Sequence, residues 1–542
     1  MKKGFTLIEL LAVIIILAVI ALIATPIVLN VVDSAKESAR RSSVAGFADA
    51  MKLGVSDYMF QNSGELPTID EDFQKTYNSK GESVICEEVY STDSYGIVLH
   101  NCKVGTDTTN YCFAKGNHYA CDDTTYNSML EYAKNGIKPN TGYQDKSGAN
   151  VPELLDNMIP VRYDGANWIY SDGTQKDWYS YDEKVWANAI VLKSGVTKTV
   201  GQTIAEDDIA LWYVWIPRYK YTIFNGNNEG VPEQVINVTF EQGIAKTGTV
   251  TCTTSTNGTG TPSSSETCID STNGSIVNGT STYTHPAFTF GSKELTGIWV
   301  GKFENSGTID NITIKPNVSS LTNTTVSAFF TGIQNIKTTY GISNGDSHMM
   351  KNMEWGATAY LKQSKYGLGI TDIGINNNSS YITGCGASAE SASSSTCNTY
   401  NTTNGMLAST TGNIYGIYDM SGGAYDYVMG NMVNSSNDFY SSNAGFSSTP
   451  DSKYYDSYTY DTLIKSHGRG KLGDATKETL VLYGNGYGGW NSNYVGFIYS
   501  SRSWFVRGGL YSGGNLAGIL YFGHVNGDSS SDYGSRSVLV SG

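Results

Sequence analysis

Charge is scarce in this sequence, and basic residues are scarcer than acidic ones. Only 16% of the 542 residues are charged, and 36 Lys and Arg stand against 50 Asp and Glu, which gives a net charge of −14. Because basic contacts to phosphates supply most of the affinity for nucleic acid, this balance argues against a nucleic-acid partner. Gly, Ser, Thr, Asn and Tyr are abundant instead, a composition typical of an exposed extracellular protein rich in strands or loops.

The sequence also lacks the short motifs of zinc and thiol chemistry. Its six His are far apart with no H-E-x-x-H pair, and none of its eight Cys belongs to a C-x-x-C pair. A G-x-S-x-G pattern at 341–345 lies in a polar stretch, so we interpret it as a turn and not as a nucleophile elbow. We therefore predict no metal and no cofactor; calcium is left open, without a motif to support it.

The cysteines fall into four pairs of close neighbours. Buried free thiols are one interpretation, but the even number, the short spacings and the polar surroundings favour disulfides formed outside the cytoplasm. Sequence alone does not determine the connectivity. The simplest pairing is Cys86 with Cys102, Cys112 with Cys121, Cys252 with Cys268, and Cys385 with Cys397.

An almost uncharged run follows the first four residues. Between residues 5 and 32 only Glu9 is charged, and these 28 residues would span roughly 42 Å as a helix, enough to cross a ~30 Å hydrocarbon core. In a secretory signal peptide the cleavage site follows the apolar core, whereas here Gly4 precedes it. We expect a single-pass membrane helix with the bulk of the chain outside the cell.

Gly4 followed by Phe5, with Glu9 four residues later and Pro26 inside the helix, closely resembles the type IV prepilin motif. The resemblance covers roughly residues 1–35. It implies that a prepilin peptidase removes the leader and methylates the new amino terminus of Phe5, and that Glu9 pairs with the amino terminus of a neighbouring pilin subunit. A carboxylate in lipid is costly without such a partner. The alternative is an ordinary anchor with a stray Glu.

The chain is predicted to be α+β, with a long pilin helix over residues 5–62. Within it Phe47 and Met51 belong to an apolar stripe that should pack against the first globular part. Short alternating strands then indicate a β-rich pilin-type head or spacer over 63–204. The Ser/Thr/Gly/Asn tract at 248–283 cannot bury a core, so it is predicted to be a surface loop tied at its base by the third cysteine pair.

Five segments of the C-terminal half resemble, in order, motifs of the formylglycine-generating-enzyme superfamily, which has a C-type-lectin-like fold: 298–304, 353–361, 416–427, 507–509 and 534–536. The resemblance implies a C-type-lectin-like ligand-binding domain over 205–542. The enzymes use a cysteine pair near the terminal Gly-Phe-Arg, but no cysteine follows Cys397 here and Ser535 replaces the Phe. Because that thiolate chemistry is impossible in this tail, we expect no enzyme.

The tail is also similar to the variable proteins of diversity-generating retroelements, which use this fold and randomise selected tail positions. Segments 483–490, 504–509 and 517–522 look like the fixed frame of such a tail. The residues expected to bind ligand are Tyr494, Phe497, Ser500, Arg502, Leu510, Tyr511, Ser512, Asn515, Leu516, His524, Val525, Asp532 and Tyr533.

The composition of the tail favours a binding surface independently. Residues 481–542 contain no Lys and no Glu, but seven Tyr, two Trp, fourteen Gly and eleven Ser. Tyr and Trp provide contact area at low entropic cost while Ser and Gly adapt, as in antibody loops. The alternative is a set of Gly- and Tyr-rich turns that binds nothing.

Together these patterns predict a pilin-like surface adhesin or receptor that performs no catalysis. Its partners would be the prepilin peptidase, other pilin subunits, the membrane, and an external protein or glycan. It would be located in the cell membrane, or on the cell surface or a pilus after processing. The alternative is a minor pilin or pseudopilin of a type IV pilus, type II secretion or DNA-uptake machine.

Processing can be tested at Gly4. We expect Gly4→Ala, or a larger residue, to block removal of the leader, because the peptidase must fit closely around the backbone at this position. Mass spectrometry of the surface protein should find an N-terminal methyl-Phe5 in the wild type. Intact Met1 on assembled wild-type protein would contradict the prepilin interpretation.

Overall fold

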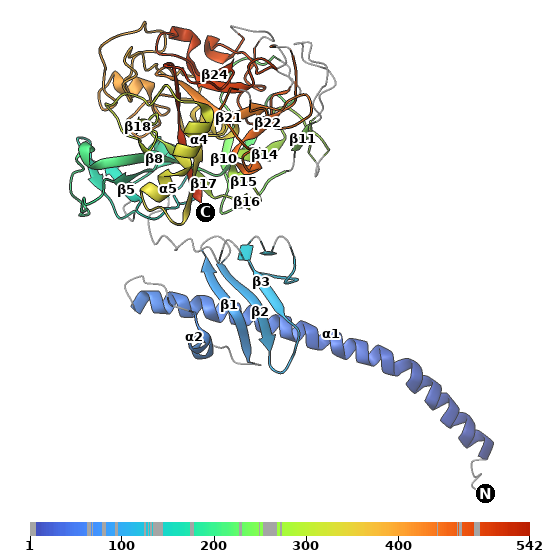
Figure 1. The fold of residues 1–542 in the computed structure, drawn as a ribbon. Coiled ribbons are helices and arrows are strands. Elements are labelled where there is room, and N and C mark those ends of the chain that lie inside the picture. Colours follow the sequence, from blue (N-terminus) through green and yellow to red (C-terminus); the bar gives the residue numbers. More distant parts are fainter. Residues whose placement is uncertain are drawn as a thin grey trace. The chain divides into compact units, whose positions relative to one another are not determined.

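The protein divides into two compact units, Met1–Thr141 and Gly142–Gly542, which are described separately below (Figure 1). The computed structural model describes residues 7–61, 67, 69–77, 83–92, 96–123, 126–127, 129–130, 133, 145–173, 178–226, 230–248, 250–252, 268–270, 274–441, 443–462, 464, 469–481 and 488–542. For residues 9, 20–21, 23–27, 71, 250–252, 268–270 and 274–275 it describes the backbone alone.

The first unit is built on the long helix α1 (Leu7–Gln61). The predicted apolar stripe is confirmed, since Phe47 and Met51 of this helix are buried in a core that also contains Val89 and Leu99 of a small sheet. That sheet is antiparallel with the strands in chain order. The other elements of the unit are α2 (Glu71–Thr76), β1 (Val84–Thr92), β2 (Gly96–Val104), β3 (Tyr111–Ala114) and β4 (Asn117–Tyr119).

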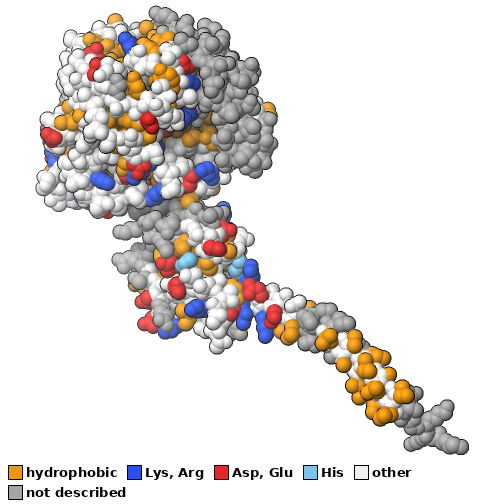
Figure 2. All heavy atoms as spheres, turned by 45° about the vertical axis from the view of Figure 1, so that its right-hand side comes forward, with side chains coloured by type: hydrophobic (Ala, Val, Ile, Leu, Met, Phe, Trp, Pro, Cys, Tyr) orange, Lys and Arg blue, Asp and Glu red, His pale blue; other side chains and the backbone are white. Residues whose placement is uncertain are grey.

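The N-terminal part of α1 exposes its apolar side chains. Leu10, Ile14, Leu17 and Val31 are all exposed, and Figure 2 shows the hydrophobic surface that such residues form along the helix. Among the described residues, none of the helices combines the length and hydrophobicity that a membrane span requires. The span expected over residues 5–32 is therefore not found there.

The second unit contains a seven-stranded antiparallel sheet in the order β20-β26-β17-β8-β7-β5-β6. Strand β8 reads Ile-Ala-Leu-Trp-Tyr-Val-Trp-Ile-Pro and is buried along its whole length, as expected of a continuous apolar run in a sheet centre. The strands are β5 (Ile159–Tyr163), β6 (Trp168–Tyr170), β7 (Asn188–Leu192), β8 (Ile209–Pro217), β17 (Gly297–Gly301), β20 (Gly345–Met349) and β26 (Ser537–Ser541).

This sheet changes the predicted domain organisation. Strands β5, β6 and β7 precede residue 204, where the spacer was expected to end, yet β7 pairs directly with β8. Residues 145–204 thus belong to the same compact unit as the tail, and the boundary falls at Thr141. The strands before and after residue 204 are apolar to a similar degree. The composition of the sequence therefore does not show whether they belong to one unit or to two.

A five-stranded sheet follows the order β22-β21-β23-β24, and β25 also pairs with β21. Its strands are β21 (Tyr425–Met432), β22 (Asp456–Tyr458), β23 (Trp504–Gly508), β24 (Gly518–Val525) and β25 (Tyr533–Ser535). The helices of the unit are α4 (Val326–Gln334), α5 (Ile336–Thr339) and α6 (Asn352–Lys362). Every residue of α6 is buried, and Glu354 in its first turn accepts the backbone N–H of Lys351 at 2.8 Å.

Short strands complete this unit: β9 (Tyr219–Thr222), β10 (Val238–Phe240), β11 (Val250–Cys252), β12 (Cys268–Asp270), β13 (Gly274–Ser275), β14 (Thr282–Thr284), β15 (Thr289–Phe290), β16 (Lys293–Glu294), β18 (Ser306–Thr308) and β19 (Asn311–Thr313).

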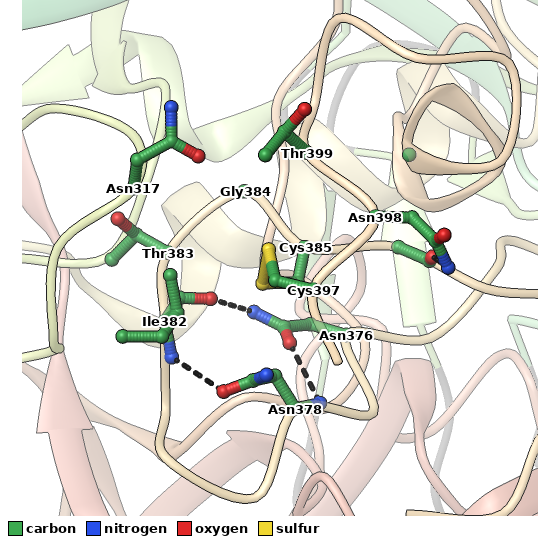
Figure 3. Close-up of a disulfide and its surroundings, with 12 residues drawn as sticks. Asn317, Asn376, Asn378, Ile382, Thr383, Gly384, Cys385, Cys397, Asn398 and Thr399 are labelled. Carbon is green, nitrogen blue, oxygen red and sulfur yellow. Dashed lines mark hydrogen bonds between the residues drawn. A yellow bond between two sulfur atoms is a disulfide. The ribbon is translucent and has the colours of Figure 1, made fainter. Parts of the chain in front are cut away.

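The structure forms three of the predicted disulfides: Cys86–Cys102, Cys112–Cys121 and Cys385–Cys397. In the fourth pair Cys252 lies opposite Cys268 across β11 and β12, and their side chains lie outside the described residues. Figure 3 shows Cys385–Cys397 beside a tight turn in which Asn376 Nδ2 donates to the Ile382 carbonyl at 2.8 Å. The Ile382 N–H in turn donates to Asn378 Oδ1 at 3.3 Å.

Buried polar groups connect the elements of the second unit. The carboxylate of Glu478 is fully buried and accepts hydrogen bonds from the hydroxyls of Tyr221 at 2.9 Å and Tyr360 at 2.8 Å. The backbone N–H of Gly473 donates to the same oxygen at 2.7 Å. Burial disfavours the ionised carboxylate more than these three hydrogen bonds favour it, so the pKa of Glu478 rises to about 7.

This raised pKa makes stability depend on pH. At pH 5 Glu478 is protonated in the folded protein but largely ionised in the unfolded chain, so the folded state binds the extra proton and its stability falls as pH rises toward 8. Between pH 5 and pH 8 we expect the Glu478→Gln variant to lose up to about 3 kcal/mol less unfolding free energy than the wild type. Urea unfolding at pH 5 and pH 8 measures it, with the exposed Glu183→Gln as control. An equal pH dependence in both variants would contradict the assignment.

Candidate ligand-binding pocket

A pocket of about 340 Å³ opens beside strands β23 and β24 of the five-stranded sheet. Its walls come from these strands, from the starts of β21 and β25, and from the loops around residues 494, 502 and 509–517. The lining residues are Tyr425, Tyr494, Arg502, Val506, Gly509, Leu510, Gly513, Leu516, Ala517, Tyr521, Gly523, His524, Val525 and Tyr533.

The backbone of the pocket is held by close packing and by hydrogen bonds. Gly509 has φ of +82°, and a Cβ atom there would lie 2.6 Å from the Cα of Ala517, so a side chain is excluded on both conformational and steric grounds. The backbone N–H of Tyr494 donates to the Leu516 carbonyl at 3.0 Å, and the Phe522 N–H donates to the Tyr494 carbonyl at 3.2 Å. These bonds fix the 494 segment alongside β24.

Four tyrosines form one continuous aromatic surface in the pocket. The rings of Tyr494 and Tyr521 stack with centroids 5.5 Å apart, and the ring of Tyr425 lies 5.5 Å from that of Tyr521 and 5.9 Å from that of Tyr533. Such offset and tilted contacts hold the rings in place while their outer faces remain available. Tyr494, Tyr425 and Tyr533 are only partly buried.

The pocket carries a single charge at neutral pH. Burial raises the pKa values of Tyr425, Tyr494 and Tyr533, so these phenols stay protonated. Burial lowers the pKa of His524 to about 4, so the imidazole is neutral. No Asp or Glu is among the described lining residues, and the remaining ionisable group is the exposed Arg502.

The pocket brings together seven of the thirteen residues that the sequence analysis expected to bind ligand: Tyr494, Arg502, Leu510, Leu516, His524, Val525 and Tyr533. Six others do not line it. Phe497 is fully buried and packs against Phe505, with ring centroids 5.0 Å apart. Tyr511 packs against Tyr381, whose hydroxyl donates to Asp532 at 2.8 Å. Ser500, Ser512 and Asn515 also lie outside the lining.

The sequence analysis missed two of the four tyrosines in the pocket. Tyr521 belongs to a segment that was assigned to the fixed frame, and Tyr425 lies far from the tail in sequence. Its strand β21 reaches the pocket because Asp426 pairs with Arg507 and Tyr425 pairs with Tyr533. Because successive side chains of a strand point to opposite faces, Tyr425 faces away from the buried Asp426.

The remaining predicted site residues lie elsewhere. Gly4 and Phe5 are outside the described residues, and of Glu9 only the backbone, within α1, is described. Within the described part of the chain no group of three or more His, Cys, Asp or Glu side chains is placed to hold a metal ion.

Comparison with known families identifies the N-terminus. Residues 1–25 match the family model of the prokaryotic N-terminal methylation motif. The N-terminus thus carries a type IV prepilin motif. This motif implies processing by a prepilin peptidase, assembly with other subunits, and an anchored N-terminus that carries an extracellular domain. No curated protein has a significant match to the chain.

The structure separates residues that support the pocket from residues that line it. Trp504 is fully buried, with its ring stacked 5.7 Å from that of Phe446, and we expect Trp504→Ala to cost about 3–5 kcal/mol of unfolding free energy. Tyr494→Ala removes a partly exposed ring and should cost about 1 kcal/mol. Denaturant unfolding measures both. Equal losses would show that Tyr494 is part of the core.

Proposed function

We propose that this protein is a pilin-like surface receptor, an adhesin that binds an external ligand in the tyrosine-lined pocket of its C-terminal unit. The observation that carries the proposal is the composition of the pocket wall. Residues from separate stretches of the tail, including Tyr494, Arg502, Leu510 and Tyr533, converge on one cavity together with Tyr425 from a distant strand. Partly exposed aromatic rings on a rigid sheet are what a binding surface needs.

The N-terminal motif and the exposed apolar residues of α1 support surface display. Large apolar side chains such as Leu11 and Ile15 are left exposed by the part of the chain that the structure describes, and exposed apolar surface of this extent marks a membrane or protein interface. We propose that this part of the helix lies in the membrane before assembly and packs against other pilin subunits afterwards, with Glu9 paired to a neighbouring amino terminus.

The packing of the five resembling segments supports a C-type-lectin-like domain. Arg536, from the last segment, donates to the carbonyls of Gly301 and Tyr418 and pairs with Asp426, so it contacts two of the other segments directly. Arg507 donates to Asn352 at the start of α6, and its guanidinium lies 5.6 Å from the ring of Trp355. All five segments thus belong to one network of contacts.

Diversification of the tail by a retroelement is part of the proposal. The proposed frame residues Trp490, Trp504, Arg507 and Arg536 are fully buried. Of the proposed variable residues, Arg502, Ser512 and Asn515 are exposed, whereas Phe497, His524 and Val525 are buried. Exposed side chains can be exchanged with small effects on folding, which is the condition that a randomised surface must meet.

We propose no catalytic activity, since the cysteines that the resembling enzymes use are absent after Cys397.

A minor pilin or pseudopilin of a type IV pilus, type II secretion or DNA-uptake machine is the second candidate. The observation that favours it is the N-terminal motif, which by itself accounts for processing and assembly without any ligand. The two candidates differ in the tail: a diversified receptor requires a reverse transcriptase gene and a near-copy of the tail's coding sequence close by. Sequencing the gene's neighbourhood, and comparing tails among sibling strains, distinguishes them.

Binding can be tested with cells that display the full chain on an array of extracellular-matrix proteins and glycans. We expect Tyr494→Ala and Tyr533→Ala each to weaken binding by about 2 kcal/mol, as for an aromatic residue in a desolvated pocket. Tyr511→Ala is the matched control, because Tyr511 is half-buried but does not line the pocket. Equal binding by the wild type and the Tyr494 and Tyr533 variants would contradict the proposal.

A further inference from the structure

Arg502 occupies an unusual electrostatic position. It lies in a tight turn closed by backbone hydrogen bonds with Tyr499 at 3.0 and 2.8 Å, and its side chain is exposed. Within the described residues its guanidinium forms no ion pair and no hydrogen bond, whereas the other arginine beside this sheet, Arg507, is buried and bound by three acceptors.

Arg502 is one of the residues that line the pocket. Burial raises the pKa values of Tyr494 and Tyr533, and the Arg502 charge opposes both rises. Burial also lowers the pKa of His524, and the same charge lowers it further. The charge of Arg502 therefore acts on three groups of the lining. Asp528 and Asp532 also act on Tyr533, but neither is part of the lining.

The rest of the lining is apolar or aromatic. Val506, Leu510, Leu516 and Val525 contribute aliphatic surface next to the tyrosine rings. A guanidinium binds carboxylates with two parallel charge-assisted hydrogen bonds, and these are among the strongest hydrogen bonds that proteins make. One cation at the edge of a neutral, aromatic cavity is thus complementary to one anionic group attached to an apolar body.

Building on the proposed function, we propose that the pocket takes a singly charged organic acid, with its carboxylate on Arg502 and its apolar or aromatic body against the tyrosine rings. The volume of about 340 Å³ suits a group of the size of one aromatic amino-acid residue. A polyanion does not fit this pattern, because the lining offers one cation and the whole chain has a net charge of −14.

The test uses 3-phenylpropanoate, its neutral isostere 3-phenylpropanamide, and glucuronate, which carries a carboxylate on a polar body. Each is titrated by calorimetry into the full chain held in lipid nanodiscs. We expect the phenyl acid to bind at least about tenfold more tightly than the amide, as for a hydrogen bond to a charged group. Glucuronate should bind more weakly than the phenyl acid, because its body cannot use the aromatic surface.

Variants assign the effect to Arg502. Arg502→Gln should reduce acid binding at least about tenfold, to the level of the amide, while Arg502→Lys retains part of the affinity. Lys193→Gln, which removes an exposed charge outside the lining, should bind like the wild type. Equal affinity for acid and amide, an Arg502→Gln variant that binds the acid normally, or tighter binding of glucuronate would each overturn the inference.

Failure of this inference is distinguishable from failure of the proposed function. If Tyr494→Ala and Tyr533→Ala abolish binding to an array ligand while the pocket does not distinguish acid from amide, the inference about Arg502 is wrong and the receptor function remains. If those two variants bind both the array ligand and the acid like the wild type, both proposals are wrong.

Discussion

The guanidinium of Arg536 is completely buried and connects three parts of the C-terminal unit. It donates to the Gly301 carbonyl of β17 at 2.7 Å, to the Tyr418 carbonyl at 3.0 Å, and it pairs with Asp426 of β21 at 3.3 Å. Because Arg536 lies between β25 and β26, these contacts join the seven-stranded sheet to the five-stranded sheet. Removing one partner of such a pair leaves a buried charge uncompensated, which costs about 3–5 kcal/mol.

Two other buried basic side chains follow the same principle. Lys302 places its Nζ within 2.8–2.9 Å of Asn188 Oδ1 and of the carbonyls of Ile414 and Gly416. Arg507 binds the carbonyls of Asp474 and Ala475. In each case protein acceptors take the place of the water molecules that would solvate the side chain. These hydrogen bonds fix irregular loops that have no regular backbone pairing. Within the described part of the chain no acceptor binds the Arg502 guanidinium, which leaves its charge for the ligand that we propose.

Local sequence patterns predicted local structure well, but they did not predict which strands pair when the strands are far apart in the sequence. The stripe that contains Phe47, three disulfides, and the burial of Trp504 and Arg536 all follow from spacing, composition or motif. The pairing of β7 with β8 does not, because an apolar strand before residue 204 gives no indication of its partner. Tyr425 was missed for the same reason. The sequence therefore located part of the tail's contribution to the pocket wall, without Tyr521, and it did not locate the contribution of β21.

The position of β26 has a consequence for biogenesis. This strand lies between β17 and β20, yet it is synthesised after every other strand of that sheet. Until it emerges, both neighbours present unpaired edges, so the sheet cannot close while the chain is still being exported. A truncated copy leaves β17 and β20 without the strand that lies between them. Among the described strands β20 pairs only with β26, so the last strand to be synthesised is also the one that joins β20 to the rest of the sheet.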